Sequence, residues 1–130
     1  MILLDTHIWV WWVAEETRLT QNQISVIKQN ESTGIGVSII SCWEVAMLVE
    51  KKRIGFTMSV KDWIEAALSY PGIVALDIIV DIAVESVQLP DSFHKDPADR
   101  IIVATARAFD CELMTNDQNI LNYQHMKTVT

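Results

Sequence analysis

Acidic side chains stand where this chain passes from an apolar run into a helical pattern: they are Asp5, Glu44, Asp99 and Asp117. Asp5 follows the apolar residues 2–4, and Asp117 follows the strand-like residues 113–115. In a parallel α/β sheet such junctions gather along the carboxyl edge, where ligands bind. We therefore expect acids that are far apart in the sequence to converge and to form a site for a divalent cation.

This set of oxygen donors contains no paired His or Cys, which favours Mg²⁺ or Mn²⁺ over Zn²⁺. Mg²⁺ usually keeps several waters and is held by one or two carboxylates together with phosphate oxygens of the substrate. Such a cation generates or orients a hydroxide and offsets the charge that builds on phosphorus. The acids therefore predict phosphate-ester hydrolysis, most naturally of a phosphodiester.

Each acid also has an ordinary structural explanation. Glu44 can complete an S-x-x-E capping box with Ser41. Asp96 and Asp117 can cap helices, and Asp99 suits the positive end of a helix dipole. Because Ser, Thr or Asn would serve equally well as caps, the use of acids at all of these corners favours a metal site over caps alone.

Asp5 adds most to the metal interpretation. The apolar run before it shows no polar alternation, which is typical of a central strand buried on both faces. An uncompensated carboxylate is costly there, and a metal ion would compensate it. His7 is not assigned to the catalytic set, because a lone His after a buried strand is more often a hydrogen-bonded structural residue.

Short apolar runs alternate with amphipathic patterns along the chain, which is typical of βαβ units and a parallel sheet. Strands are expected over residues 2–4, 36–40, 73–76, 113–115 and 126–129. Helices are expected over about residues 8–14, 20–31, 41–52, 59–70, 82–89, 96–108 and 119–121. Three tryptophans at positions 9, 11 and 12 indicate core packing rather than a platform for stacking bases.

The chain has 130 residues, half of them hydrophobic, and shows no linker, repeat or low-complexity tract, so we expect one domain over residues 1–130. Residues 8–14 form an apolar stretch too short to span a bilayer, and no basic segment precedes them, so no membrane association is expected. Cys42 and Cys111 lack C-x-x-C spacing and are expected to be reduced thiols in a cytoplasmic protein.

The net charge of −7 argues against a nucleic-acid partner, because Lys and Arg drive phosphate binding. A cation held by the acids would cancel part of their charge and make phosphate binding less unfavourable. Basic residues also cluster at positions 51–53. Lys95 and Arg100 flank the acids of residues 96–99. A solvated surface is the commoner meaning of such a run, and phosphate contact by residues 51–53 stays an alternative.

Blocks of sequence in a fixed order resemble the PIN-domain ribonucleases, most closely the VapC-like toxins of toxin–antitoxin pairs. The blocks are ILLDTH at residues 2–7, SCWEVA at 41–46, HKDPADRIIVATA at 94–106 and LMTND at 113–117. A lone D-T or T-N-D motif would be weak evidence for this family, whereas the ordered set of blocks with its D-P-x-D-R stretch is specific evidence for it. The likeness spans essentially the whole chain.

This resemblance implies a PIN-like three-layer α/β sandwich, with a central parallel sheet of four to five strands flanked by helices. It implies a Mg²⁺- or Mn²⁺-dependent endoribonuclease that cleaves RNA and is held inactive by a cognate antitoxin. It also implies a homodimer, for which the Trp-rich residues 8–14 offer surplus rings to bury. Asp5, Glu44, Asp99 and Asp117 fall on the family's catalytic and metal-binding positions.

Other residues of the blocks take supporting positions under the same resemblance. Asp96 matches an extra acid of a D-P-x-D subgroup, and is a metal ligand, a neighbour of a ligand or a cap. Thr6, Ser41 and Thr115 provide hydroxyls near the acids, where a hydroxyl can orient a carboxylate or a water. Arg100 is placed to meet phosphate or to pair with a nearby acid.

Two further functions remain open from the residues themselves. A small-molecule phosphoesterase also uses acidic strand ends, although the stretch from Asp5 to His7 lacks the second aspartate of an aspartyl-phosphate mechanism. A non-catalytic interaction module could instead bind a basic partner segment in an acidic pocket. Its binding would be unaffected by chelators, which distinguishes it from either enzyme.

Overall fold

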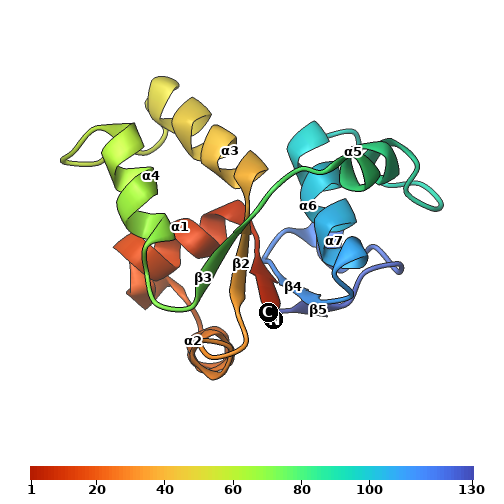
Figure 1. Ribbon diagram of the computed structural model, residues 1–130, viewed down its shortest axis with the longest axis horizontal. Coiled ribbons are helices and arrows are strands. Elements are labelled where there is room, and N and C mark those ends of the chain that lie inside the picture. The colour runs from red at the N-terminus through yellow and green to blue at the C-terminus, as the bar shows by residue number, and fades with distance from the viewer.

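The computed structural model describes residues 1–130, in which a parallel sheet lies between helices (Figure 1). Its five strands pair in the order β3-β2-β1-β4-β5, and every pairing is parallel. The strands are β1 (Ile2–Leu4), β2 (Ile35–Ser38), β3 (Ile73–Leu76), β4 (Glu112–Met114) and β5 (Thr128–Val129). The predicted α/β architecture with a central parallel sheet is confirmed.

Strand β1 lies at the centre of the sheet, as its unbroken apolar run predicts. The chain runs outward from β1 to β2 and β3, and then returns to place β4 and β5 on the other side of β1. The strand order therefore reverses between β1 and β4. In open α/β sheets ligands bind at such a reversal, outside the carboxyl ends of the strands.

The helices divide between the two faces of the sheet (Figure 1). They are α1 (Thr6–Ala14), α2 (Gln21–Gln29), α3 (Ile39–Glu50), α4 (Val60–Leu68), α5 (Val80–Val87), α6 (Pro97–Ala108) and α7 (Gln118–Leu121), with a 3₁₀ turn η1 (Glu16–Arg18). Alternate residues of β1 point to opposite faces. Ile2 and Leu4 join the core under α1–α4, and Leu3 joins the core under α5–α7.

Several helices begin at the predicted capping residues. Thr20 and Gln23 form a reciprocal capping box at the start of α2, with both bonds 3.0 Å long. Ser59 caps α4, and Asp96 caps α6 with Pro97 at the first helical position. These starts depend on side chains within a few residues of the helix, so the local sequence suffices to place them.

The predicted start of α3 is wrong. Ser38 caps the helix and accepts from the Ile40 N–H (3.2 Å), so the helix begins at Ile39 rather than near Ser41. Ser41 is thus the third residue inside the helix, and the proposed capping box with Glu44 does not form. The β-branched pair at 39–40 resembles the end of a strand, but the buried Ser38 hydroxyl starts the helix before it.

The tryptophans of the first helix belong to the core, as predicted. Trp9 is fully buried and its ring lies 5.4 Å from that of Trp63, which in turn stacks on Phe56 at 4.2 Å. Trp11 and Trp12 are half-buried against the same cluster. The tryptophan rings therefore stabilise the packing of α1 and α4 on the sheet.

None of the helices combines the length and the apolar character that a membrane crossing requires. The longest, α3 and α6, have 12 residues each. Cys42 and Cys111 are free thiols, and burial raises the pKa of both.

Candidate active site

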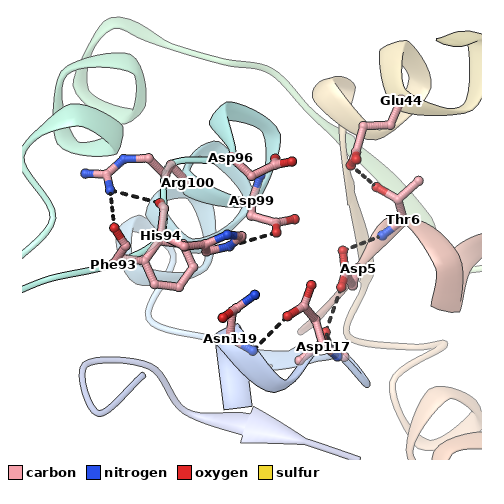
Figure 2. Close-up of polar contacts among 11 residues, drawn as sticks. Asp5, Thr6, Glu44, Phe93, His94, Asp96, Asp99, Arg100, Asp117 and Asn119 are labelled. Carbon is pink, nitrogen blue, oxygen red and sulfur yellow. Dashed lines mark hydrogen bonds and ion pairs between the residues drawn. The ribbon is translucent and has the colours of Figure 1, made fainter. Parts of the chain in front are cut away.

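Asp5 is held at the end of β1 by both of its carboxylate oxygens (Figure 2). Oδ1 accepts from the Thr6 N–H (2.8 Å), which caps α1, and Oδ2 accepts from the Thr115 hydroxyl (2.6 Å). The Asp5 N–H donates to the Met114 carbonyl (2.9 Å) and thereby extends the β1–β4 pairing. Asp5 is only 8% exposed, so a buried carboxylate stands where the strand order reverses.

The Thr115 hydroxyl joins two acids of the site. While it donates to Asp5, its oxygen accepts from the Asp117 N–H at 3.0 Å. Asp117 caps α7, and its Oδ1 accepts from the Asn119 N–H at 2.8 Å. The corner after β4 thus sets Asp117 beside Asp5, on the other side of the strand-order reversal.

Glu44 reaches the site from α3 and is anchored by Thr6. The Thr6 hydroxyl lies 2.5 Å from Glu44 Oε1 and 2.8 Å from the Ser41 hydroxyl oxygen. Because Thr6 has one hydroxyl proton, it donates to the carboxylate and accepts from Ser41. Both hydroxyl groups are buried, so they direct Glu44 toward the end of β1.

Asp96 and Asp99 enter from the first turn of α6. Asp96 Oδ1 accepts from the Asp99 N–H (3.0 Å), so Asp96 caps the helix on the exposed rim of the site. The Asp99 side chain is 13% exposed, and its Oδ2 lies 2.9 Å from His94 Nε2. That nitrogen is buried and makes no aligned hydrogen bond, so its contact with Asp99 is one of proximity.

We call Asp5, Glu44, Asp96, Asp99 and Asp117 the acidic cluster. The pKa of Asp99 is raised to about 8, first by burial and then by repulsion from the other four members. Burial also raises the pKa of Asp5 and of Glu44, although the hydrogen bonds that they accept act in the opposite direction. Full ionisation of the cluster would therefore leave negative charge that its surroundings do not compensate.

The acidic cluster fits a hard divalent cation by its chemistry. Its carboxylates come from β1, α3, α6 and the corner before α7, and Figure 2 shows Asp5, Asp99 and Asp117 around a common space. In this arrangement no three acidic, His or Cys side chains are close enough together to hold one ion. The Glu44 carboxylate instead accepts from the Thr6 hydroxyl, and the Asp99 carboxylate lies against His94.

Arg100 points away from the acidic cluster (Figure 2). Its Nε donates to the Ser86 carbonyl (2.7 Å), and Nη1 donates to the carbonyls of Phe93 (3.1 Å) and His94 (3.2 Å). No acid of the cluster lies within ion-pair distance of its guanidinium, so the expected pairing with a nearby acid does not form. Arg100 supports the site indirectly, because it fixes the loop that carries His94.

Two residues shape the site without having been singled out for it from the sequence. Gln23 is fully buried and donates from Nε2 to Asn116 Oδ1 (2.9 Å), which ties α2 to the corner before α7. His94 contacts Asp99. Its position just before the D-P-x-D-R stretch is the sequence signal that could have identified it as a site residue. His7, by contrast, is exposed.

Comparison with known proteins places these features in a family. The model of the PIN domain family matches residues 2–125. The chain belongs to the PIN-domain family. This PIN domain is also 34% identical over 129 residues to Ribonuclease VapC22 of Mycobacterium tuberculosis, and the match covers 99% of this chain and 96% of the relative.

Solved structures share the fold of this PIN domain at low sequence identity. A chain of the VapBC2 structure from Rickettsia felis, bound to a promoter DNA fragment, has a TM-score of 0.74 at 16% identity and covers 99% of this chain and 98% of its own. A chain of FitAcB from Neisseria gonorrhoeae has a TM-score of 0.71 at 17% identity, covering 100% and 97%. The PIN-like fold predicted from the sequence is confirmed.

Proposed function

We propose that this PIN-domain protein is a metal-dependent endoribonuclease and the toxin of a toxin–antitoxin pair. The acidic cluster at the strand-order reversal carries the proposal, because a divalent cation would compensate these buried carboxylates in their ionised form. The relative matched over nearly its whole length is named as a ribonuclease, and a solved structure of similar fold, from Klebsiella pneumoniae, is a toxin–antitoxin complex.

In this proposal Asp5, Glu44, Asp99 and Asp117 are the catalytic and metal-binding residues, and Asp96 assists from the rim. When bound, Mg²⁺ or Mn²⁺ supplies Lewis-acid polarisation of the phosphate and a bound water of lowered pKa. The carboxylates would hold the cation and orient an attacking water, and one of them would accept the proton of that water as its oxygen bonds to phosphorus. The bond from phosphorus to the leaving oxygen of the RNA would break in the same displacement, and the leaving oxygen would take up a proton.

The hydroxyl residues keep the acids in position for this reaction. Thr115 holds Asp5 and the Asp117 backbone together, and Thr6 with Ser41 holds Glu44. Such outer contacts orient ligands and typically change metal affinity 10- to 100-fold when they are removed. Arg100 contributes by fixing the loop before α6.

The proposed protein partners are a cognate antitoxin and a second copy of this chain. Exposed valines line one side of α5 at the helical spacing i, i+4, i+7: Val80, Val84 and Val87 are 77%, 46% and 74% exposed. This valine side of α5, rather than the Trp-rich α1, is the face that we propose to be covered by the second copy.

The proposed activity is tested by incubating the purified chain, free of antitoxin, with a mixed pool of structured RNAs. We expect discrete cuts with Mg²⁺ or Mn²⁺ and none with EDTA. Hydrolysis of small phosphate esters without RNA cleavage would favour the phosphoesterase. Binding of a basic peptide that is insensitive to EDTA, with no hydrolysis of either substrate, would favour the interaction module.

A further inference from the structure

A pocket of about 210 Å³ opens beside the acidic cluster. It lies between α7, the segment that follows it, and the loop before α6. Six of the residues that line it are Phe93, His94, Asn119, Asn122, Tyr123 and Gln124. Sites for drug-sized molecules usually measure roughly 300–1,000 Å³, so this smaller pocket suits a single planar ring system.

The pocket shares two of its walls with the acidic cluster. His94 Nε2 lies 2.9 Å from Asp99 Oδ2, and the Asn119 N–H donates to Asp117 Oδ1 at 2.8 Å. Figure 2 shows the Asn119 side chain between Asp117 and the His94 ring. A group bound in the pocket is therefore an immediate neighbour of any phosphate held by the acids.

The lining combines aromatic rings with neutral amides. The rings of Phe93 and Tyr123 pack with their centroids 4.7 Å apart. Tyr123 is only 6% exposed and its hydroxyl donates to the Pro90 carbonyl, so the half-buried Phe93 ring supplies most of the accessible aromatic surface. The amides of Asn122 and Gln124 are exposed at the mouth, and each provides donors and an acceptor.

The charge of the lining disfavours an anion. No Lys or Arg lines the pocket, so a phosphate would find no cation there. The one acid of the lining, Asp91, is engaged by His125, whose Nε2 lies 2.6 Å from Asp91 Oδ2. A neutral planar ligand with hydrogen-bonding edges matches the lining better than a charged one.

We propose that this pocket binds one unpaired nucleobase of the RNA, next to the phosphate that is cleaved, and sets the base preference of the enzyme. The inference rests on the proposed ribonuclease function. Single-stranded RNA is read in this way elsewhere, by contact of an unstacked base with aromatic rings and by hydrogen bonds to the edge of the base. Asn and Gln amides are suited to reading such edges.

Binding is tested first, without reference to activity. The metal-free ¹⁵N-labelled protein is titrated with adenosine, guanosine, cytidine and uridine, and the side-chain amide signals are followed by NMR. We expect at least one nucleoside to shift the signals of Asn119, Asn122 and Gln124 and to leave that of Gln21, on α2, unchanged. The absence of any shift at the pocket amides with all four nucleosides would overturn the proposal.

Cleavage then tests whether the pocket selects RNA. With Asn122→Ala or Gln124→Ala, we expect the preference for one base beside the cut to relax by about tenfold, through KM more than kcat. The control Gln21→Ala should cut as the wild type does. An unchanged preference in both variants would overturn the proposal. If the wild type cuts no RNA, the ribonuclease proposal fails by itself, and the nucleoside titration still decides whether the pocket binds a base.

Discussion

Burial, followed by repulsion from the other members of the acidic cluster, raises the pKa of Asp99. Its pKa is raised from an ordinary 3.8 to about 8, so the metal-free native state keeps a proton that the unfolded chain releases. Between these two pKa values the native state binds more protons than the unfolded state. The free energy of unfolding of the metal-free protein therefore falls as the pH rises through this window.

We predict that the melting temperature in EDTA decreases between pH 5 and pH 8. Asp99→Asn should reduce this decrease and stabilise the metal-free protein at pH 8 by about 1 kcal/mol, or roughly 3 °C. Asp62→Asn, which removes an exposed acid of α4, is the control and should retain the wild-type pH dependence. Identical pH dependence in Asp99→Asn and the wild type would contradict the assignment of a raised pKa to Asp99.

Thr115 tests whether a hydroxyl positions the acids. Thr115→Val removes the donor to Asp5 and the acceptor of the Asp117 N–H, so we expect about tenfold weaker Mn²⁺ binding by calorimetry. Thr105→Val is the matched control, since its buried hydroxyl donates only to the Ile101 carbonyl within α6. Equal Mn²⁺ affinity in the two variants would show that Thr115 has a packing role alone.

At the scale of elements, the start of a helix can be predicted from the sequence where its capping contacts are local. The helix starts at Thr20, Ser59 and Asp96 follow from caps whose partners lie within three residues. The start of α3 does not, because Ser38 and Ser41 are both plausible caps in sequence. Both serines are buried in the structure, and the Ser41 hydroxyl bonds to Thr6 of another helix. Ser38 is therefore the residue that caps α3.

Arg100 illustrates a role that only the assembled elements reveal. Its guanidinium joins the carbonyls of α5 and of the loop before α6, so Arg100→Met leaves Ser86, Phe93 and His94 without this donor. We predict a loss of about 2 kcal/mol in the free energy of unfolding, measured in urea. Arg53→Met, at an exposed position after α3, should change it by less than about 0.5 kcal/mol. A loss no larger than in Arg53→Met would refute the structural role.

At the scale of the whole molecule, the parallel topology explains why acids so distant in sequence could be expected to meet. Asp5 and Asp117 follow the strands β1 and β4, which flank the reversal of strand order. What could not be foreseen were the contacts made between loops and helix faces, such as Gln23 with Asn116. Those contacts have no periodic signal, because they depend on how separate elements pack.

The apolar side of α5 makes a prediction about assembly. Val84→Asp places a charge in the middle of the exposed valine stripe and should convert a homodimer into a monomer, measured by sedimentation at micromolar concentrations. Met58→Asp, which alters an exposed side chain before α4, should leave the dimer intact. A wild type that is monomeric in the absence of antitoxin would contradict the proposed dimer face.

The central claim is that the acidic cluster cleaves RNA with a divalent cation. It is tested most directly by comparing the wild type, Asp5→Asn and Asp62→Asn on one structured RNA pool with Mg²⁺ or Mn²⁺, after circular dichroism has shown that all three are folded. We predict that Asp5→Asn loses cleavage by at least about a thousandfold, whereas Asp62→Asn cuts at the wild-type sites and rate. Undiminished cleavage by folded Asp5→Asn would contradict the account.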